Sequence, residues 1–241
     1  MSQKIHAWLR FFRVVNLPTV PGDVLAGAAM ASCTSPALPD FRAIAAASLA
    51  AVLLYMFGLA DNDIVGAATD RDRPIPQGLI SLRAARVARS LCVLGAIGLG
   101  LAASLPQPWW LAASTLAVAI VIYNRTKAAA VMGLCRGFNV ACGAPAAIPA
   151  WSWRGDTAVG IVAALWTLYI FGVTNYSEGE ENDPARKRRV GLLIGALVWL
   201  QLAATLFHDV LFRNFSFAAA QIAMIALLFL FKRLMPKVSA S

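Results

Sequence analysis

Eight of the twelve acidic residues of this chain fall within two short segments that lie far apart in the sequence. These acids are Asp61, Asp63, Asp70 and Asp72 in the first segment, and Glu178, Glu180, Glu181 and Asp183 in the second. Carboxylates at this density repel one another unless positive charge neutralises them. Arginines of the same segments could provide that charge, and so could a divalent cation that binds carboxylates from both.

A magnesium–diphosphate site would use both kinds of charge. Mg²⁺ prefers oxygen ligands, usually takes one or two carboxylates directly, and completes its shell with water and substrate phosphate. Arginine and lysine side chains hold the phosphate oxygens that the metal leaves free. Basic residues stand among or beside the acids in both segments. The pattern therefore favours binding of a diphosphate together with Mg²⁺, with neutralisation by arginine alone as the alternative.

The spacing within each segment supports a shared set of ligands. Asn62 and Asp70 are eight residues apart, about two helical turns, so they share one face if a helix continues through the segment. Asp63 lies one residue off that face. Glu178 and Glu181 are three residues apart and would also share a face. Each segment is thus expected to present its oxygen ligands in one direction.

The elements that carry these segments are predicted to be membrane-spanning helices. Of the 241 residues, 59% are hydrophobic and only 14% are charged, and the mean hydropathy is +0.67. A soluble domain of this length carries far more charge. Eight apolar stretches are long enough to cross a bilayer. They cover roughly residues 14–34, 42–60, 84–104, 107–123, 129–150, 157–176, 190–208 and 215–234. We therefore expect an all-α, polytopic membrane bundle of about eight transmembrane helices.

The basic residues predict the orientation of this bundle. With eight spans, 18 of the 21 lysines and arginines fall on the side of the two termini, and only Arg42, Arg154 and Arg213 fall on the other. The positive-inside rule then places both termini and both acidic segments in the cytoplasm. The net charge of +9 reflects this asymmetry and an affinity for anionic membrane lipid. Nucleic acid is not an expected partner, because the basic residues are split among membrane-flanking loops.

The first acidic segment resembles a known motif. The run Asn62-Asp63-x-x-Gly66-x-x-x-Asp70 resembles the NDxxDxxxD motif of the UbiA superfamily of intramembrane prenyltransferases, and the following RDRPIPQGLIS is similar to the tail of that motif. The opening RFFRVVNLPTVPGDVLAGAAMA looks like the first span of the family. The segment YNRTKAAAVMGLCRGFNVACG resembles a small bacterial branch, the EboC-like proteins.

Two departures separate this chain from the family pattern. Gly66 stands where the family has the middle acid of the first motif, and TNYSEGEENDPARKRR replaces the usual DxxxD of the second. The family also commonly has nine spans, whereas eight are predicted here. These departures leave open an alternative, in which the protein is a UbiA-like lipid-binding or export component without transferase activity. A transporter is less favoured, because the charge gathers at one membrane face and not near mid-membrane.

The resemblance implies an enzyme, a prenyltransferase with Mg²⁺ as its cofactor. It implies transfer of a prenyl group from a polyprenyl diphosphate to a lipophilic or aromatic acceptor at the cytoplasmic mouth of the bundle. The implied setting is the inner, cytoplasmic membrane of a bacterium, and residues 1–241 are expected to form a single UbiA-like domain without internal repeats. The implied metal ligands are Asn62, Asp63, Asp70, Glu178, Glu180 and Glu181, and all of these except Glu180 form the expected catalytic set.

Substrate contacts are expected from cations and from polar residues inside the spans. Ionisable side chains within membrane spans are costly and usually face the interior of the bundle. Asn16 and Asp23 are seven residues apart and are expected to line the cavity, with pairing of Asp23 to an arginine as the alternative. Arg136 and Asn139 share a helical face, where the alternative role is an interhelical hydrogen bond. The full set of predicted substrate contacts is Arg71, Arg73, Lys127, Arg136, Asn139, Asn16, Asp23, Tyr123 and Tyr176.

Overall fold

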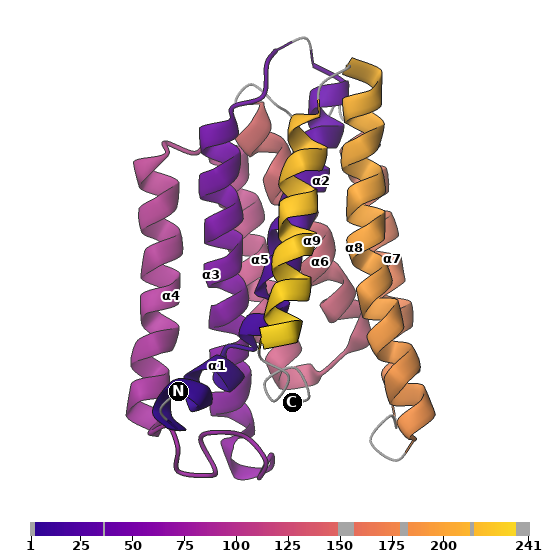
Figure 1. The fold of residues 1–241 in the computed structure, drawn as a ribbon. Coiled ribbons are helices and arrows are strands. Elements are labelled where there is room, and N and C mark those ends of the chain that lie inside the picture. The colour runs from indigo at the N-terminus through magenta and orange to yellow at the C-terminus, as the bar shows by residue number, and fades with distance from the viewer. Residues whose placement is uncertain (1–2, 36, 149–156, 179–182, 213–214, 235–241) are drawn as a thin grey trace.

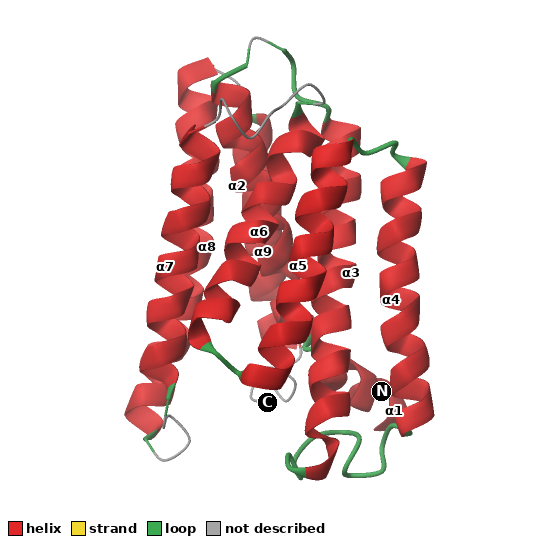
Figure 2. Cartoon of the chain, turned by 180° about the vertical axis from the view of Figure 1, so that it is seen from behind, coloured by secondary structure: helices red, strands yellow, loops and turns green. Residues whose placement is uncertain are grey.

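A computed structural model describes residues 3–35, 37–148, 157–178, 183–212 and 215–234. Throughout these ranges the regular structure is helical (Figures 1 and 2). The elements are α1 (Gln3–Phe11), the 3₁₀ helix η1 (Val14–Thr19), α2 (Val20–Cys33), α3 (Phe41–Val65), the 3₁₀ helix η2 (Gly66–Ala68), α4 (Leu82–Ala102), α5 (Gln107–Thr126), α6 (Ala129–Ala147), α7 (Thr157–Ser177), α8 (Pro184–Phe212) and α9 (Ser216–Leu234). Within the described ranges, α2 to α9 correspond to the eight predicted spans, so the predicted all-α membrane bundle is confirmed.

Six segments of the described chain are long and apolar enough to cross a membrane. They are residues 3–33, which join α1 to α2, then 41–68, which include α3, and the helices α4, α7, α8 and α9. The remaining two long helices, α5 and α6, are not among these six segments, and each carries polar side chains, such as Asn124 on α5 and Arg136 on α6. Both still belong to the bundle, because α6 packs against α2, α5 and α7.

One end of the bundle gathers both acidic segments. In Figures 1 and 2 the long helices run side by side and alternate in direction, while α1 lies across the lower end. The loop between α3 and α4 and the adjoining ends of α7 and α8 lie at that same end. We call it the acidic end and define it by residues 66–81, Glu178 and Asp183. The described parts of both acidic segments therefore share one side of the bundle, as the alternation of spans predicts.

Small residues allow the central helices to pack unusually closely. A Cβ atom at Gly27 of α2 would overlap the carbonyl oxygen of Val140 on α6, and one at Gly143 of α6 would overlap the carbonyl oxygen of Val24 on α2. Helices in a membrane associate through such close backbone contacts, because lipid offers no hydrophobic driving force between them. The α2–α6 contact thus depends on glycine at both positions.

Local signals in the sequence fix where three helices begin. The side chain of Asp40 accepts hydrogen bonds from the backbone N–H groups of Arg42 and Ala43, and caps α3. Ser81 caps α4 in the same way. Asp183 caps α8, and the N–H groups of Arg186 and Ala185 lower the pKa of its carboxyl group. Asp183 is therefore engaged in starting a helix, although it belongs to the second acidic segment.

Candidate functional site

A cavity of about 280 Å³ runs from the acidic end into the bundle between α3, α5 and α6. Its apolar wall is formed by Val20, Ala51, Leu59, Leu116, Ile120 and Met132. Arg13, Arg73, Lys127 and Arg136 also line it, whereas none of the described lining residues is acidic. The cavity therefore combines a strongly positive surface with an apolar interior, which suits an anion that carries a hydrocarbon tail.

Two of the basic residues that line the cavity have an unusual backbone conformation. Arg13 has φ of 42° and Lys127 has φ of 56°, both in the left-handed region. Among the described residues, one further non-glycine residue, Ser104, has a positive φ. This conformation costs about 1–2 kcal/mol for a residue with a Cβ atom, and such costs gather at functional sites. Lys127 ends α5 in this conformation, where its N–H bonds the carbonyl oxygen of Tyr123 at 2.7 Å.

A network of ion pairs closes the mouth of the cavity. Arg73 pairs through Nη1 with Asp63 and through Nε with Oδ2 of Asp70, at 3.0 Å in the second case. Lys127 donates a hydrogen bond through Nζ to Oδ1 of Asn62. Asp63 is buried, while the Asp70 side chain is 43% exposed. The predicted first-segment ligands thus lie together at the mouth, each joined to a cation that lines the cavity. We call Asp63, Arg73 and Asp70 the mouth centre.

The backbone reaches this arrangement by a different route from the predicted one. A shared helical face for Asn62 and Asp70 requires the helix to continue through Asp70, but α3 ends at Val65, and η2 and a turn follow. Asp70 nevertheless folds back toward Gly66, where an added Cβ would lie 2.8 Å from its Oδ2. The condition for a shared helical face is therefore not met, because the chain leaves the helix at Gly66. The proximity of Asn62, Asp63 and Asp70 arises from the turn.

Asp61, an acid that was not among the predicted ligands, is not part of the cavity wall. It is buried and accepts hydrogen bonds at 3.0 Å from Arg89 of α4 and from Asn124 of α5. Arg125 lies 3.9 Å from its second oxygen. These contacts join α3 to its two neighbours. For Asp61, the alternative interpretation of the acidic segment therefore holds, in which arginines neutralise the acids.

A second buried centre surrounds Asp23, deep in the bundle. Its carboxylate accepts hydrogen bonds from four side chains: Arg136 at 2.7 Å, Asn139 at 3.0 Å, Trp166 at 3.1 Å and Gln201 at 2.7 Å. Asp23 is fully buried and is not among the residues that line the cavity. We call Asp23 and its four donors the inner centre.

The expectation that Asn16 and Asp23 line the cavity is therefore wrong. Asp23 turns toward α6, α7 and α8 because those helices supply its hydrogen-bond donors, so pairing with an arginine, the alternative role, is the one observed. Asn16 lies in η1, where its carbonyl oxygen accepts a hydrogen bond from Thr19, and it does not appear in the cavity wall either. Arg136 and Asn139 do line the cavity, and both also contact Asp23.

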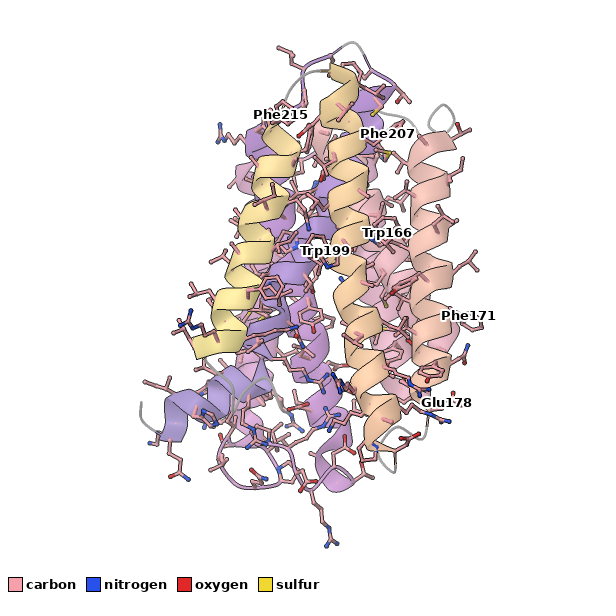
Figure 3. The ribbon with its side chains drawn as sticks, turned by 45° about the vertical axis from the view of Figure 1, so that its right-hand side comes forward. Trp166, Phe171, Glu178, Trp199, Phe207 and Phe215 are labelled. Carbon is pink, nitrogen blue, oxygen red and sulfur yellow. The ribbon has the colours of Figure 1, made fainter. Side chains whose placement is uncertain are left out.

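The second acidic segment contributes less to the described site. Glu178 is exposed at the acidic end (Figure 3), and its carbonyl oxygen accepts a hydrogen bond from Arg186 at 2.7 Å. Tyr176 is also exposed and lies near Arg186 and Arg189. Glu180 and Glu181 lie outside the described residues. Within the described ranges, no group of three or more histidine, cysteine or acidic side chains could hold a metal ion.

Several lining residues were not among the predicted contacts, and four predicted contacts, Asn16, Asp23, Arg71 and Tyr176, are not part of the cavity wall. Arg13, Tyr55 and Asn124 line the cavity, whereas Arg71 is exposed and does not. Arg13 is one of the 18 basic residues on the side of the termini, and its position beside the first apolar stretch is the sequence signal for its place in the cavity. Lys127 also lies 5.7 Å from the ring centroid of Tyr123, a predicted contact that does line the cavity.

Comparison with known proteins identifies the fold. No protein-family model and no curated protein sequence matches the chain. A solved structure of digeranylgeranylglyceryl phosphate synthase is similar, with a TM-score of 0.60 and 18% identity, over 99% of this chain and 93% of that one. The chain has a UbiA-like fold. A UbiA homologue from Archaeoglobus fulgidus bound to GPP and Mg²⁺ matches with a TM-score of 0.58 and 13% identity, over 98% of this chain and 88% of that one. The same homologue bound to DMAPP and Mg²⁺ gives a TM-score of 0.57 and 12% identity, over 96% and 87%.

The UbiA-like fold agrees with the family resemblance at the level of architecture. The match extends over nearly the whole of this chain, so all the described helices take part in it. The narrower resemblance to the EboC-like branch stays a prediction. The cavity therefore belongs to a helical membrane bundle of known architecture, and its chemistry has to be argued from its own residues.

Proposed function

We propose that this protein is a membrane prenyltransferase that moves a prenyl group from a polyprenyl diphosphate to an acceptor. The observation that carries the proposal is the cavity itself, which has cations at its mouth and an apolar wall inside. Arg13, Arg73 and Lys127 would bind the diphosphate, and the residues of the apolar wall would hold the prenyl chain. The solved UbiA homologues that bind GPP or DMAPP support this assignment.

The transfer would begin with cleavage of the allylic carbon–oxygen bond. The bonding electrons leave with the pyrophosphate, and the cations at the mouth stabilise the negative charge that develops there. An electron pair of the acceptor then forms the new bond to the allylic carbon. The acceptor releases one proton, which passes to the pyrophosphate or to water at the mouth. The apolar wall excludes water from the allylic carbon and so favours transfer over hydrolysis.

The residues at the mouth also have the chemistry for Mg²⁺. Asn62, Asp63 and Asp70 offer oxygen ligands beside the cations, and Glu178, Glu180 and Glu181 are the candidates from the second acidic segment. Mg²⁺ would neutralise charge on the diphosphate and so make it a better leaving group. Arg73 and Lys127 now hold the carboxylates and the amide. These two cations would turn to the diphosphate as the oxygen ligands turn to the metal.

The proposal includes a place in the cell and a set of partners. Because basic residues predominate at the acidic end, we place that end and both termini in the cytoplasm, in the inner membrane of a bacterium. The chain would act as a single domain of residues 1–241 surrounded by membrane lipid. Its substrates would be a polyprenyl diphosphate and a lipophilic or aromatic acceptor.

Pyrophosphate release tests the proposal directly. Purified protein would be incubated with farnesyl or geranylgeranyl diphosphate, Mg²⁺ and a range of acceptors. We expect release that requires both Mg²⁺ and an acceptor, and a loss of about 100-fold in Arg73→Gln. Arg83→Gln, which removes an exposed cation of α4 that does not line the cavity, is the matched control and should stay within about twofold of the wild type.

The same assay separates the alternative function. Binding of the prenyl diphosphate without pyrophosphate release, with any acceptor, would support a lipid-binding or export component. Gly66 is the observation that favours this alternative, because it removes one carboxylate from the mouth. Absence of both binding and release would rule out both functions.

A further inference from the structure

The cavity has the same depth along two neighbouring helices. Its wall on α3 extends from Asn62 to Ala51, which are eleven residues apart and therefore about 16 Å apart along the helix axis. On α5 and its C-cap the wall extends from Lys127 to Leu116, also eleven residues and about 16 Å. Lys127 donates a hydrogen bond to Asn62, so both lengths are measured from the same level at the mouth. Ala51 and Leu116 therefore lie at the same depth.

Beyond Ala51 and Leu116 the bundle is closely packed. One helical turn further along, Ala47 of α3 is 0% exposed and Ala112 of α5 is 2% exposed. Both belong to the same buried apolar cluster as Ala51 and Leu116, together with Val24, Trp109, Cys142 and Ala146. Of these described residues, only Ala51 and Leu116 line the cavity. We call Ala51 and Leu116 the inner limit, because the cavity ends there.

The turn of each helix nearest the mouth is the part that the proposed function assigns to the diphosphate. This turn extends from Asn62 to Gly58 on α3 and from Lys127 to Tyr123 on α5, four residues or about 6 Å in each case. Between this turn and the inner limit, seven residues remain on each helix. The prenyl chain therefore has a length of about 10 Å available.

That length corresponds to two isoprene units. Each unit adds four carbon–carbon bonds of about 1.5 Å to the chain and extends over about 5 Å. The chain cannot leave the cavity between α3 and α5 beside the first unit, because a Cβ atom at Gly58 would lie only 2.9 Å from Cγ2 of Ile120. A third unit would have to displace the packed side chains beyond the inner limit, which is costly in a well-packed core.

We infer that the preferred donor is geranyl diphosphate, which has two isoprene units, and that Ala51 and Leu116 set this chain length. The inference rests on the proposed function, since it names the donor of that reaction. It assigns the two residues a role in specificity and no part in the chemistry. Farnesyl and geranylgeranyl diphosphate would still be donors, but weaker ones.

Competition between donor analogues tests the inference. Purified wild-type protein in detergent, with Mg²⁺ and bound radiolabelled geranyl thiodiphosphate, would be mixed with the unlabelled dimethylallyl, geranyl, farnesyl or geranylgeranyl analogue at equal mole fraction in the micelles. We expect the geranyl analogue to displace the label about tenfold more effectively than each of the other three. Farnesyl or geranylgeranyl analogues that compete as well as the geranyl analogue, or better, would overturn the inference.

Two substitutions at the inner limit should change this order in opposite directions. Ala51→Leu shortens the cavity, so the affinity for the geranyl analogue should fall about tenfold while that for the dimethylallyl analogue stays within about twofold. Leu116→Ala leaves a space at the inner limit, so the farnesyl analogue should come within about threefold of the geranyl analogue. Because detergent takes up a given analogue equally with every variant, these changes report on the cavity.

Matched controls carry the same substitutions on exposed positions of the same helices. They are Ala45→Leu on α3 and Leu111→Ala on α5, and neither residue lines the cavity. Both should keep the order of the wild type. An order that stays unchanged in a folded inner-limit variant, or that changes equally in its control, would contradict the role of the inner limit.

The proposed function can fail separately from this inference. Absence of pyrophosphate release with every donor, geranyl diphosphate included, would overturn the proposed transfer. Release that is fastest with geranylgeranyl diphosphate would keep the transferase and exclude the inner limit as the determinant of chain length.

Discussion

The inner centre and the mouth centre both pair aspartate with arginine, but the two centres hold their carboxylates differently. At the inner centre, Asp23 receives four donors from three helices and is fully buried. At the mouth centre, one arginine pairs with two carboxylates, and one of these, Asp70, lies partly exposed on a loop. The first arrangement satisfies the carboxylate completely. The second leaves oxygen atoms and an arginine that can exchange partners.

This difference separates a structural acid from candidate catalytic ones. A buried charge that loses its partner is strongly destabilising, so the inner centre has to stay intact for the bundle to fold. The proposed function requires the opposite property at the mouth, because diphosphate and Mg²⁺ would have to replace existing contacts. Acidity and burial alone therefore do not separate the structural acid from the candidate functional ones. The number and direction of the hydrogen-bond donors around each carboxylate distinguish them.

The largest expected effect is on stability, at the inner centre. Asp23→Asn would leave Arg136 without its counter-ion and would point an amide N–H₂ group at other donors. We expect the free energy of unfolding to fall by about 3–5 kcal/mol. Asp63→Asn should cost much less, about 1–2 kcal/mol, because Arg73 keeps Asp70. Denaturant unfolding in detergent, followed by tryptophan fluorescence, measures both values. Equal losses would remove the distinction between the two centres.

For activity, the larger direct effect is expected at the mouth centre. Asp70→Ala should lower the rate of pyrophosphate release by about 100- to 1000-fold, because it removes an oxygen ligand at the mouth. The free energy of unfolding of this variant should change by less than about 1 kcal/mol, since Asp70 is a loop residue. Asp72→Ala is the matched control: the backbone carbonyl of this exposed acid accepts bonds from Arg10 and Gln77 whatever its side chain. Turnover near the wild-type level in Asp70→Ala would refute the ligand assignment.

A smaller effect concerns pH at the mouth. Partial burial, and then the nearby charge of Arg73, lower the pKa of Lys127. The ammonium charge is present below that pKa and lost above it, so diphosphate affinity should fall by about tenfold as the pH rises into the alkaline range. Lys127→Arg should move the loss to higher pH, because arginine stays protonated. Calorimetric titration with pyrophosphate across this range measures the shift. Identical profiles for the two proteins would exclude Lys127 as the titrating contact.

The smallest expected effect is a gain in stability. Lys127→Gly should relieve the left-handed backbone and raise the free energy of unfolding by up to about 1 kcal/mol, while pyrophosphate binds more weakly. Ser104→Gly, which has a similar φ of 50° outside the cavity wall, should give a similar gain with unchanged binding. Lys127→Ala should give no gain. A lower free energy of unfolding in Lys127→Gly would show that the left-handed backbone at this position does not reduce the stability of the protein.

The helices could be predicted from sequence more fully than the site. Apolar length and the distribution of lysine and arginine predict the helices and bring both acidic segments to one end, because membrane spans follow from composition. The prediction failed where the chain leaves the helix at Gly66, since a glycine does not reveal whether a helix ends or continues. Asp70 still reached the mouth through the turn.

Roles within the polar set could not be separated by spacing. Asp23 and Arg136 both lie within spans, and periodicity does not reveal which one faces the cavity and which faces neighbouring helices. The answer depends on hydrogen-bond donors from α7 and α8, which lie more than a hundred residues from Asp23 in the chain. Arg13 was missed for a related reason. A basic residue beside a membrane span can determine the orientation of the span just as well as it can line a cavity, and sequence alone does not separate these roles.

The glycine contact between α2 and α6 has a consequence for how the cavity can change size. Gly27 and Gly143 bring the two backbones into direct contact, so neither helix can slide or rotate against the other without a clash. These helices also supply Val20, Arg136 and Asn139 to the cavity. That side of the cavity is therefore fixed in position. A longer prenyl chain would require α3 and α5, on the opposite side of the cavity, to move outward.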